Sequence, residues 1–259
     1  MTDASVILPT YNEAENIEWI IDSLLEALSG LDFEIIVVDD NSPDGTSEIV
    51  TALKADRPQV RLVTRLTDRG LLKSIKEGIK VANSDVCVWM DADMTMQPSD
   101  VHRLLKEIDN GADLAFGSRY VEGGSIKGND AEEGNKGLFS AWKNLKHSED
   151  SFLAVAISQL GNITVRYVLD RRFYDYTSGF YAVRKHVFDK VELSGHYLDY
   201  CISFLHRANM NGFVISEVPV VMTPRIKGVS KTSNSFIDLL PIIFVCLKTI
   251  TFLMFYRKR

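Results

Sequence analysis

The sequence predicts an α/β fold in which a mostly parallel sheet is flanked by helices. Short β-branched apolar runs at 6–8 and 34–38 enclose a stretch, 16–28, whose apolar residues recur at helical spacing, so the chain opens with a βαβ unit. The same alternation continues to residue 116, which is typical of a doubly wound, Rossmann-like sheet. A length of 259 residues with 46% hydrophobic and 25% charged residues is ordinary for one folded domain.

The remaining elements follow in order along the chain. Further helices are predicted at 46–56, 71–82, 152–169 and 198–210. Further strands are predicted at 60–64, 86–90, 114–116 and 213–221, and 176–183 is predicted to be a turn that leads into a strand. The stretch 122–150 is rich in Gly, Asn, Lys and Glu without an apolar period, so we expect a loop there. The predicted domain covers 1–235, and an apolar helix with a basic tail covers 236–259.

Charge and cysteine usage exclude several classes of protein. A formal net charge of −6 and a pI near 5.4 give no electrostatic footprint for nucleic acid, so none is expected as a partner. Cys87, Cys201 and Cys246 are isolated in apolar stretches, which favours neither disulfides nor a zinc site and fits a reducing cytoplasm. The N-terminus lacks the pattern of a secretory signal, so we expect the domain to face the cytosol.

The C-terminal segment 236–256 is almost entirely apolar. It is interrupted by Asp238, Pro241 and Lys248 and is followed by three basic residues. Its length approaches that of a membrane-spanning helix, but a single span would place the basic tail away from the cytosolic domain, against the positive-inside tendency. We therefore favour a helix lying in the membrane interface over a span, with a core helix docked on the domain as the remaining alternative.

Two carboxylates, Asp91 and Asp93, follow the apolar run 86–90. Residues two apart on a strand share a face, so these side chains are predicted to converge on one divalent cation, Mg²⁺ or Mn²⁺. A cation held in this way neutralises a diphosphate leaving group. Taken alone, an Asp-x-Asp sequence also occurs in ordinary solvated turns.

Other strand-end loops carry groups suited to a nucleotide. Asp40 and Glu13 are hydrogen-bond acceptors for a base or ribose, whereas Asp39 is interpreted as a cap for its own turn. Arginine and lysine side chains that can meet phosphate oxygens stand at Arg119, Arg225 and Lys231.

Together these motifs resemble a known family. Residues 6–13, 37–46, 91–93, 117–120 and 178–180 are similar to the inverting family 2 glycosyltransferases of GT-A fold. Residues 217–219, Arg225 and 228–231 are similar to the dolichol-phosphate mannose synthase branch of that family. The resemblance covers most of 6–231.

The resemblance implies a role for individual residues. Nucleotide-sugar contacts would come from Pro9, Tyr11, Glu13, Val38, Asp40, Asp91, Ala92, Asp93, Arg119, Arg225 and Lys231. Asp91 and Asp93 would hold the Mn²⁺ or Mg²⁺. Asp93 and Arg119 would be catalytic, and Arg119 with Ser158 would contact the acceptor phosphate.

The implied reaction is inverting transfer of one sugar, mannose from GDP-mannose, to a polyprenyl or dolichyl phosphate at the cytoplasmic face of a membrane. A phosphate monoester is already ionised at neutral pH, so little general base is needed. The implied partners are the nucleotide sugar, the polyprenyl phosphate lipid and the membrane surface, with a small membrane subunit or a second copy as further partners. Two alternatives stay open, a UDP-sugar donor (glucose or N-acetylglucosamine) and a non-catalytic nucleotide-sugar-binding homologue.

Three positions depart from the branch. Thr95 stands where a glutamine often reaches the metal, and Ala154 stands where an arginine usually precedes Ser158 by four residues. The stretch 125–150 is longer than the usual acceptor loop. The first two departures put the metal shell and one acceptor-phosphate contact in question.

Overall fold

The computed structural model describes residues 3–126, 152–195, 198–223 and 236–256, without the side chains of 126, 152–158, 236–240 and 242. In chain order its elements are β1 (Ala4–Thr10), α1 (Ile17–Ala27), β2 (Phe33–Asp39), α2 (Thr46–Leu53), β3 (Val60–Thr64), α3 (Leu71–Val81), β4 (Val86–Trp89), α4 (Ser99–Asp109), β5 (Leu114–Ser118), β6 (Ser125–Ile126), α6 (Phe152–Val168), β7 (Tyr181–Arg184), the 3₁₀ helix η2 (Lys185–Asp189), α7 (Asp199–Met210), β8 (Ile215–Pro219), β9 (Val221–Met222) and α8 (Phe236–Met254).

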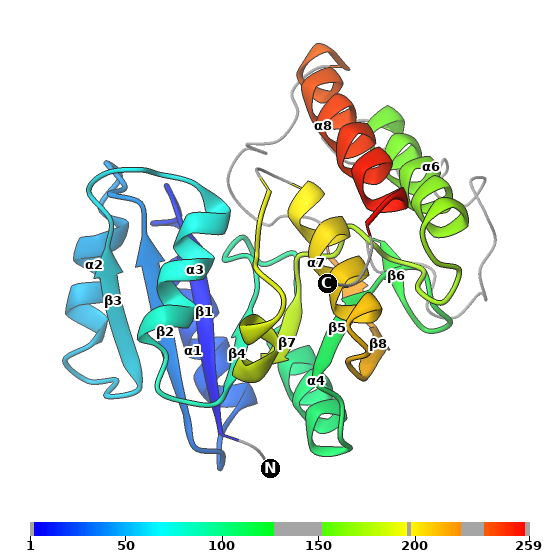
Figure 1. The fold of residues 1–259 in the computed structure, drawn as a ribbon. Helices are drawn as coiled ribbons and strands as arrows, with labels where there is room; N and C mark the ends of the chain where they lie inside the picture. Colours follow the sequence, from blue (N-terminus) through cyan, green and yellow to red (C-terminus); the bar gives the residue numbers. More distant parts are fainter. Residues whose placement is uncertain (1–2, 127–151, 196–197, 224–235, 257–259) are drawn as a thin grey trace.

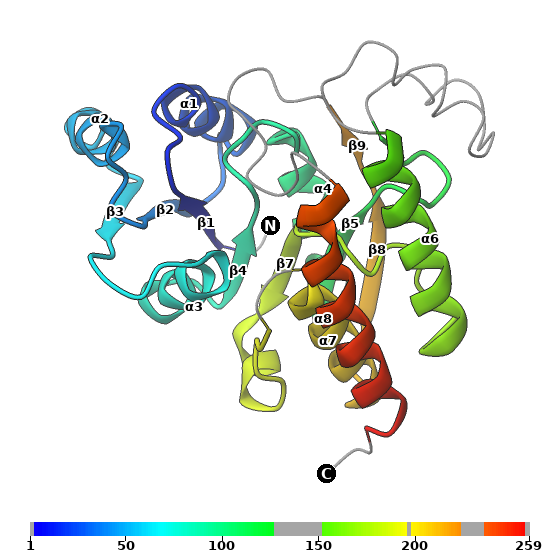
Figure 2. The same ribbon diagram turned by 90° about the horizontal axis from the view of Figure 1, so that it is seen from above.

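The main sheet has the order β3-β2-β1-β4-β7-β5-β8, and β6 pairs with β9 in a small second sheet. All pairings in the main sheet are parallel except those of β7, which runs antiparallel to both of its neighbours, β4 and β5. Helices cover both faces of the sheet (Figures 1 and 2). The predicted mostly parallel α/β sheet is therefore confirmed.

Strand alternation divides the core into two layers. In β1, Val6 and Leu8 face one layer with α1, α2 and α4, while Ile7 faces the other with α3, η2 and α7. Gly78 lets α3 approach the sheet closely, because a Cβ at this position would lie 2.4 Å from Ile7 Cγ2. Burial on both faces explains why the strands read as continuous apolar runs.

Three parts of the structure differ from the prediction. The strand before Asp91 ends at Trp89, so Asp91 and Asp93 lie in a loop and strand alternation does not set their orientation. Helix α4 was not predicted, although its buried residues Val101, Leu104, Leu105 and Ile108 follow helical spacing. The predicted loop 122–150 contains β6, and its remainder from 127 lies outside the described residues.

Helix α8 packs against α7 and α6. Its Ile250 and Leu253 are buried in the second layer, while Phe244 and Phe252 are exposed. The docked-helix alternative thus describes one face of α8, and the opposite face remains apolar and accessible. Within the described ranges, no helix combines the length and apolarity needed to cross a bilayer. The division into 1–235 and 236–259 stays a prediction.

Candidate active site

Most of the predicted site residues that the structure describes lie at the carboxyl edge of the sheet, at the ends of β1, β2, β4 and β5 or in the loops that follow them. This is the edge at which open α/β sheets bind ligands. Parallel pairing brings Pro9 of β1 opposite Val38 of β2, with Val38 fully buried and Pro9 half-buried. Any ligand contact at Val38 would therefore involve its backbone rather than its side chain.

Asp39 is a structural acceptor, as the sequence predicted. It is fully buried and accepts hydrogen bonds from Thr10 Oγ1 at 3.0 Å, from the Ser42 backbone nitrogen at 2.9 Å and from Ser47 Oγ at 2.8 Å. These bonds fix the β2 loop and the first turn of α2. The interpretation of Asp39 as a turn cap is confirmed.

Asp40 lies at the centre of a polar cluster that the sequence did not reveal. Its side chain is buried, with the residue only 5% exposed. Oδ1 accepts from Arg65 Nη1 at 2.6 Å and from Ser74 Oγ at 2.8 Å, and Oδ2 accepts from the Gly70 backbone nitrogen at 2.7 Å. Because a carboxylate offers about four acceptor positions, roughly one remains on Oδ2 for a ligand.

Arg69 connects three strand-end loops. Its Nη1 donates to Tyr11 Oη at 3.2 Å and its Nη2 to the Asn41 carbonyl at 3.2 Å, with the guanidinium 5.0 Å from the Tyr11 ring centroid. Asn41 has a positive φ of 55°, which an asparagine tolerates better than most residues. The loop 65–70 after β3 thus belongs to the site. Its position at a strand end and its two arginines were the signals that would have identified it.

Glu13, in the loop after β1, is bonded to the first residue of α2. Its backbone nitrogen donates to Thr46 Oγ1 at 3.1 Å, and its Oε2 accepts from Asn16 Nδ2 at 3.0 Å. The side chain is half-buried. Its predicted contact with a nucleoside stays a prediction.

We expect Arg65→Ala to weaken donor binding more than it slows turnover. Loss of this arginine breaks its ion pair with the Asp40 carboxylate and removes one of the three hydrogen bonds described for that carboxylate. The expected result is a rise in the donor KM of roughly 10-fold with a smaller change in kcat. Steady-state kinetics of Arg65→Ala and Arg65→Lys test this, because the lysine variant should recover part of the loss. Equal falls in kcat and kcat/KM with unchanged KM would contradict it.

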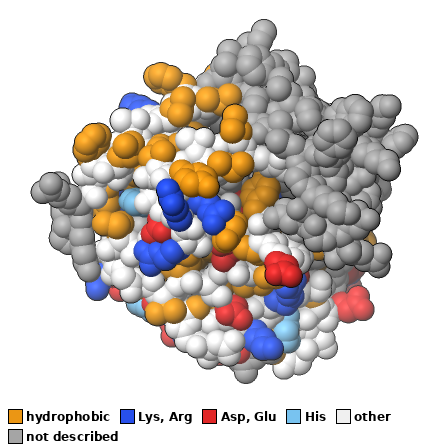
Figure 3. Space-filling view, turned by 90° about the vertical axis from the view of Figure 1, so that its right-hand side faces the viewer, with side chains coloured by type: hydrophobic (Ala, Val, Ile, Leu, Met, Phe, Trp, Pro, Cys, Tyr) orange, Lys and Arg blue, Asp and Glu red, His pale blue; other side chains and the backbone are white. Residues whose placement is uncertain are grey.

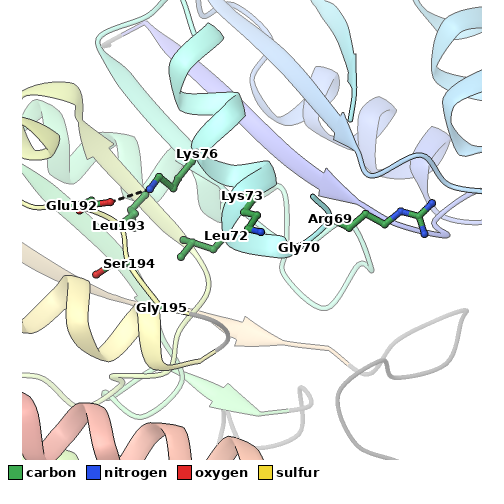
Figure 4. A pocket seen from close by; sticks show the side chains of 9 residues that line it. All are labelled: Arg69, Gly70, Leu72, Lys73, Lys76, Glu192, Leu193, Ser194 and Gly195. Atoms are coloured by element: carbon green, nitrogen blue, oxygen red, sulfur yellow. Dashed lines mark hydrogen bonds and ion pairs between the residues drawn. The ribbon is translucent and has the colours of Figure 1, made fainter. Parts of the chain in front are cut away.

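A pocket with a cavity volume of about 380 Å³ adjoins this cluster, between the first half of α3 and residues 192–195 before α7. Figure 4 shows Lys73 and Lys76 on the α3 side, with Lys76 reaching Glu192 at 3.2 Å. Gly70 lines the pocket and also donates to Asp40. The pocket therefore extends the site along α3, where Lys73 and Lys76 are each paired with a carboxylate, Asp68 and Glu192.

The loop 90–98 carries the two predicted metal ligands. Asp93 is 4% exposed, and its Oδ1 accepts from the Thr95 backbone nitrogen at 3.0 Å and from Thr95 Oγ1 at 2.7 Å. Thr95 therefore orients the Asp93 carboxylate. Ala92 is buried, Asp91 is half-buried, and Met94 takes a positive φ of 67°.

Asp91 lies near the start of α7. Burial raises the pKa of Tyr200 well above its ordinary value, and the negative charge of Asp91 adds to the rise. Burial likewise raises the pKa of the Cys201 thiol, with Asp91 again contributing. Both groups are therefore neutral at physiological pH, which excludes Cys201 as a thiolate nucleophile.

The donor set fits a hard divalent cation. Within the described ranges, no three His, Cys, Asp or Glu side chains stand together as a complete metal cage. Mg²⁺ and similar cations are commonly bound by one or two carboxylates, with substrate phosphates and water completing the shell. Asp91 and Asp93 supply such a pair, so they would hold Mn²⁺ or Mg²⁺ jointly with a diphosphate.

The end of β9 is tied to the loop that carries the predicted metal ligands. The Thr223 backbone nitrogen donates to the Thr95 carbonyl at 3.0 Å, and Thr223 Oγ1 donates to the Met94 carbonyl at 2.9 Å. Arg225 and Lys231 lie outside the described residues. Thr223, the last described residue before them, therefore lies beside the loop of Asp93.

Arg119, after β5, is held in an ion pair with Asp175, whose side chain is fully buried, while that of Arg119 is 14% exposed. Its Nε donates to Asp175 Oδ2 at 2.7 Å, and its Nη2 donates to Asp175 Oδ1 and to Thr177 Oγ1, both at 2.8 Å. Burial opposes the charged form of Arg119, but the Asp175 carboxylate outweighs it, so the pKa of Arg119 is raised and the side chain stays cationic. These bonds use Nε and Nη2. A phosphate contact by Arg119 stays a prediction. It would use Nη1, because Nε and Nη2 already donate to Asp175 and Thr177.

Asp175 was not predicted from the sequence, nor was the way in which Glu217 and Asn162 support its loop. Glu217 accepts from the backbone nitrogens of Tyr174 and Asp175 at 3.0 Å, and burial raises the pKa of Glu217. Asn162 of α6 donates to Thr177 Oγ1 at 2.8 Å. The Ser158 backbone lies in α6 one turn before Asn162, and its side chain is outside the described residues.

Comparison with known proteins identifies the family. Residues 5–191, which run from β1 beyond η2, match the model for glycosyl transferase family 2. The chain belongs to this family. The family 2 match thus includes the carboxylates of β2 and the β4 loop, together with the Arg119–Asp175 pair.

Two curated relatives extend the family 2 similarity to about nine-tenths of the chain. A dolichol-phosphate mannosyltransferase from Pyrococcus furiosus is 35% identical over 233 residues, which are 90% of this chain and 60% of that protein. A polyprenol monophosphomannose synthase from Mycolicibacterium smegmatis is 37% identical over 238 residues, 89% of this chain and 81% of that protein. The chain thus spans less than two thirds of the first relative.

Solved structures share the fold of this family 2 chain. Glucosyl-3-phosphoglycerate synthase from Mycobacterium tuberculosis, with Mn²⁺, uridine-diphosphate-glucose and phosphoglyceric acid, superposes with a TM-score of 0.68 at 17% identity. The superposition covers 98% of this chain and 80% of that one. A complex of the same enzyme with phosphoglyceric acid gives a TM-score of 0.66, also at 17% identity. At this identity the likeness concerns the fold alone.

Proposed function

We propose that this protein transfers mannose from GDP-mannose to a polyprenyl phosphate, with inversion at the anomeric carbon. The observation that carries the proposal is the pair of relatives described above. Both are named for joining mannose to a polyprenol or dolichol phosphate, and both match about nine-tenths of this chain at 35% and 37% identity. The site supports it with paired carboxylates for a diphosphate-bound cation and a largely buried arginine at the same edge of the sheet.

In the proposed reaction, an oxygen of the acceptor phosphate forms a bond to the anomeric carbon while the bond to the diphosphate oxygen breaks. The departing nucleoside diphosphate keeps the electron pair. The acceptor is ionised, so the protein has no proton to remove, and catalysis rests on orientation and charge. A cation held by Asp91 and Asp93 would neutralise the leaving diphosphate.

Different residues of the site would orient the nucleoside and supply positive charge to the phosphates. The remaining acceptor position of Asp40 and the Tyr11 ring held by Arg69 would orient the nucleoside. Arg119, fixed by Asp175, would place positive charge near the two phosphates as they approach. Fixed charges of this kind stabilise the transition state without reorganising during the reaction.

We also propose that the protein works at the cytoplasmic face of a membrane, as a peripheral or monotopic protein. The acceptor carries a long lipid tail, and the accessible face of α8 is apolar. Deleting 236–259 would be a poor test of this location, because it would also uncover the core contacts of Ile250 and Leu253.

The test is transfer of radiolabelled sugar from a panel of GDP- and UDP-sugars into organic-extractable lipid, with Mn²⁺ and a polyprenyl phosphate. Activity with GDP-mannose alone is the expected result. Activity only with UDP-glucose or UDP-N-acetylglucosamine would replace the donor in the proposal. Binding of nucleotide sugars without any lipid product would favour a non-catalytic homologue.

A further inference from the structure

Thr223, which follows β9, holds the loop of the predicted metal ligands through three hydrogen bonds. Besides donating to the Met94 and Thr95 carbonyls, it accepts a bond on Oγ1 from Gln97 Nε2 at 3.0 Å. The hydroxyl thus accepts from one group and donates to another, which directs its proton toward Met94. The two side-chain bonds join residues 126 and 129 positions apart, so the fold and not the loop alone creates them.

The peptide unit between Met94 and Thr95 connects Thr223 to Asp93. Its carbonyl accepts from Thr223 Oγ1 at 2.9 Å, and its N–H donates to Asp93 Oδ1 at 3.0 Å. The C=O and N–H of a planar trans peptide point in opposite directions and turn together, so fixing the carbonyl also fixes the N–H. Thr95 Oγ1 adds a bond of 2.7 Å to the same carboxylate oxygen. The orientation of the Asp93 carboxylate therefore depends on Thr223.

Met94 has a strained backbone that needs such an external contact. Its φ of 67° lies in the left-handed region, which residues with a Cβ adopt uncommonly. Strained backbone persists only where the surrounding structure holds it. The Met94 and Met96 side chains are buried, and the Thr223 hydroxyl bonds directly to the Met94 carbonyl. Without that hydroxyl, we expect the Met94–Thr95 peptide to leave the orientation that aims its N–H at Asp93.

The segment that ends in Thr223 also reaches the arginine side of the site. The backbone nitrogen of Val220 donates to the Ser118 carbonyl at 2.9 Å, and Ser118 directly precedes Arg119. Val220 is only 2% exposed, so this contact is shielded from water. One end of the short segment is thus bonded to the strand that leads to Arg119, and the other end is bonded to the loop of Asp93.

We propose that Thr223 is a positioning residue for the divalent cation, and that its hydroxyl aims the Asp93 carboxylate through the Met94–Thr95 peptide. Because residues 220–223 are bonded at both ends, they also set the spacing between the cation and Arg119. Groups that orient a metal-binding carboxylate raise its affinity for the metal. A hydroxyl that only held β9 in place would affect stability and leave cation affinity unchanged. This role deepens the proposed function and rests on it.

Mn²⁺ titration of the full chain with GDP, followed by electron paramagnetic resonance, tests this role without requiring catalysis. Thr223→Val retains the backbone N–H and a similar shape but lacks the hydroxyl, and it should weaken Mn²⁺ binding by about 10-fold or more. Thr223→Ser, which keeps the hydroxyl, should recover most of the loss. The matched control Thr51→Val removes an exposed hydroxyl that also bonds to a backbone carbonyl, that of Ser47 at 2.8 Å, and should bind like the parent.

Bound Mn²⁺ is a better readout than bound GDP. Lys and Arg side chains also gather on the outer face of the molecule in Figure 3, where a nucleoside diphosphate can bind through charge alone. The Asp93→Ala variant, titrated in parallel, gives the background signal of Mn²⁺ that is held without this carboxylate. Gln97→Met provides a second variant with Thr223 intact, because it removes the amide that holds the hydroxyl, and about a threefold loss of Mn²⁺ affinity is expected.

Steady-state transfer gives an independent measure of the same role. The KM for Mn²⁺ of Thr223→Val should rise by about 10-fold, while saturating Mn²⁺ restores most of kcat. Thermal unfolding without metal shows whether each variant is folded. Parent-like Mn²⁺ affinity in folded Thr223→Val and Gln97→Met, or no recovery in Thr223→Ser, would overturn the role of Thr223. A parent protein that binds no Mn²⁺ with GDP would overturn the carboxylate pair as well, whereas Mn²⁺ binding without sugar transfer would count against the proposed reaction alone.

Discussion

We expect Asp91→Ala or Asp93→Ala to abolish sugar transfer while the protein stays folded. Each change removes one of two carboxylates available in the loop after β4 for a cation on the diphosphate. We expect a loss of about 10³-fold or more in kcat/KM, because the cation contributes several kcal/mol of charge stabilisation in the transition state. Mn²⁺-dependent transfer of labelled sugar measures the loss, and circular dichroism checks the fold.

A matched control is Asp189→Ala, which removes an exposed carboxylate at the end of η2 and should leave transfer unchanged. Isothermal titration of Mn²⁺ in the presence of a nucleoside diphosphate separates metal binding from chemistry. Weaker Mn²⁺ binding by both loop variants is expected. Full turnover in either one would show that the carboxylate pair does not hold the metal.

Asp175→Asn is expected to destabilise the fold and to impair activity together. The change leaves the largely buried Arg119 guanidinium without its counter-charge. Breaking a buried pair in this way costs about 3–5 kcal/mol, which for a domain of this size lowers the unfolding midpoint by roughly 10 °C. Thermal unfolding and transfer assays of the same preparation measure both effects.

The double variant Asp175→Asn/Arg119→Met separates structure from function. Replacing Arg119 removes the guanidinium charge that Asp175→Asn leaves unpaired. Some of the lost stability should return, because replacing both partners of a buried pair lowers the free energy of unfolding less than removing one. Activity should not return, since Arg119 is then absent from the site. Recovery of activity together with stability would assign Arg119 a purely structural role.

The local patterns of the sequence predicted the sheet, the role of Asp39 and the loops at its carboxyl edge. These features depend on short apolar runs and turn residues, which a single chain segment displays. The strand was extended too far toward Asp91 because the apolar run continues to Met90, although strand pairing stops at Trp89. Burial extends the apolar pattern beyond the hydrogen-bonded strand.

The missed features depend on contacts between distant segments. Arg119 and Asp175 are 56 residues apart, and Arg65 reaches Asp40 across 25 residues. No spacing rule links such pairs, because their proximity follows from strand order. The sequence also did not predict which face of α8 is buried, because both faces are apolar and composition alone does not show which one α7 covers.

The antiparallel strand β7 has a consequence for how this chain folds. It lies between β4 and β5, and both of these precede it by more than 60 residues in the sequence. During synthesis the β1–β4 half can already bury its own apolar residues, but β5 has no place beside β4 until β7 emerges. Contacts between such remote segments form slowly. The half that carries Asp40 is thus expected to be ordered early, whereas the pairing of Arg119 with Asp175 awaits the last third of the chain.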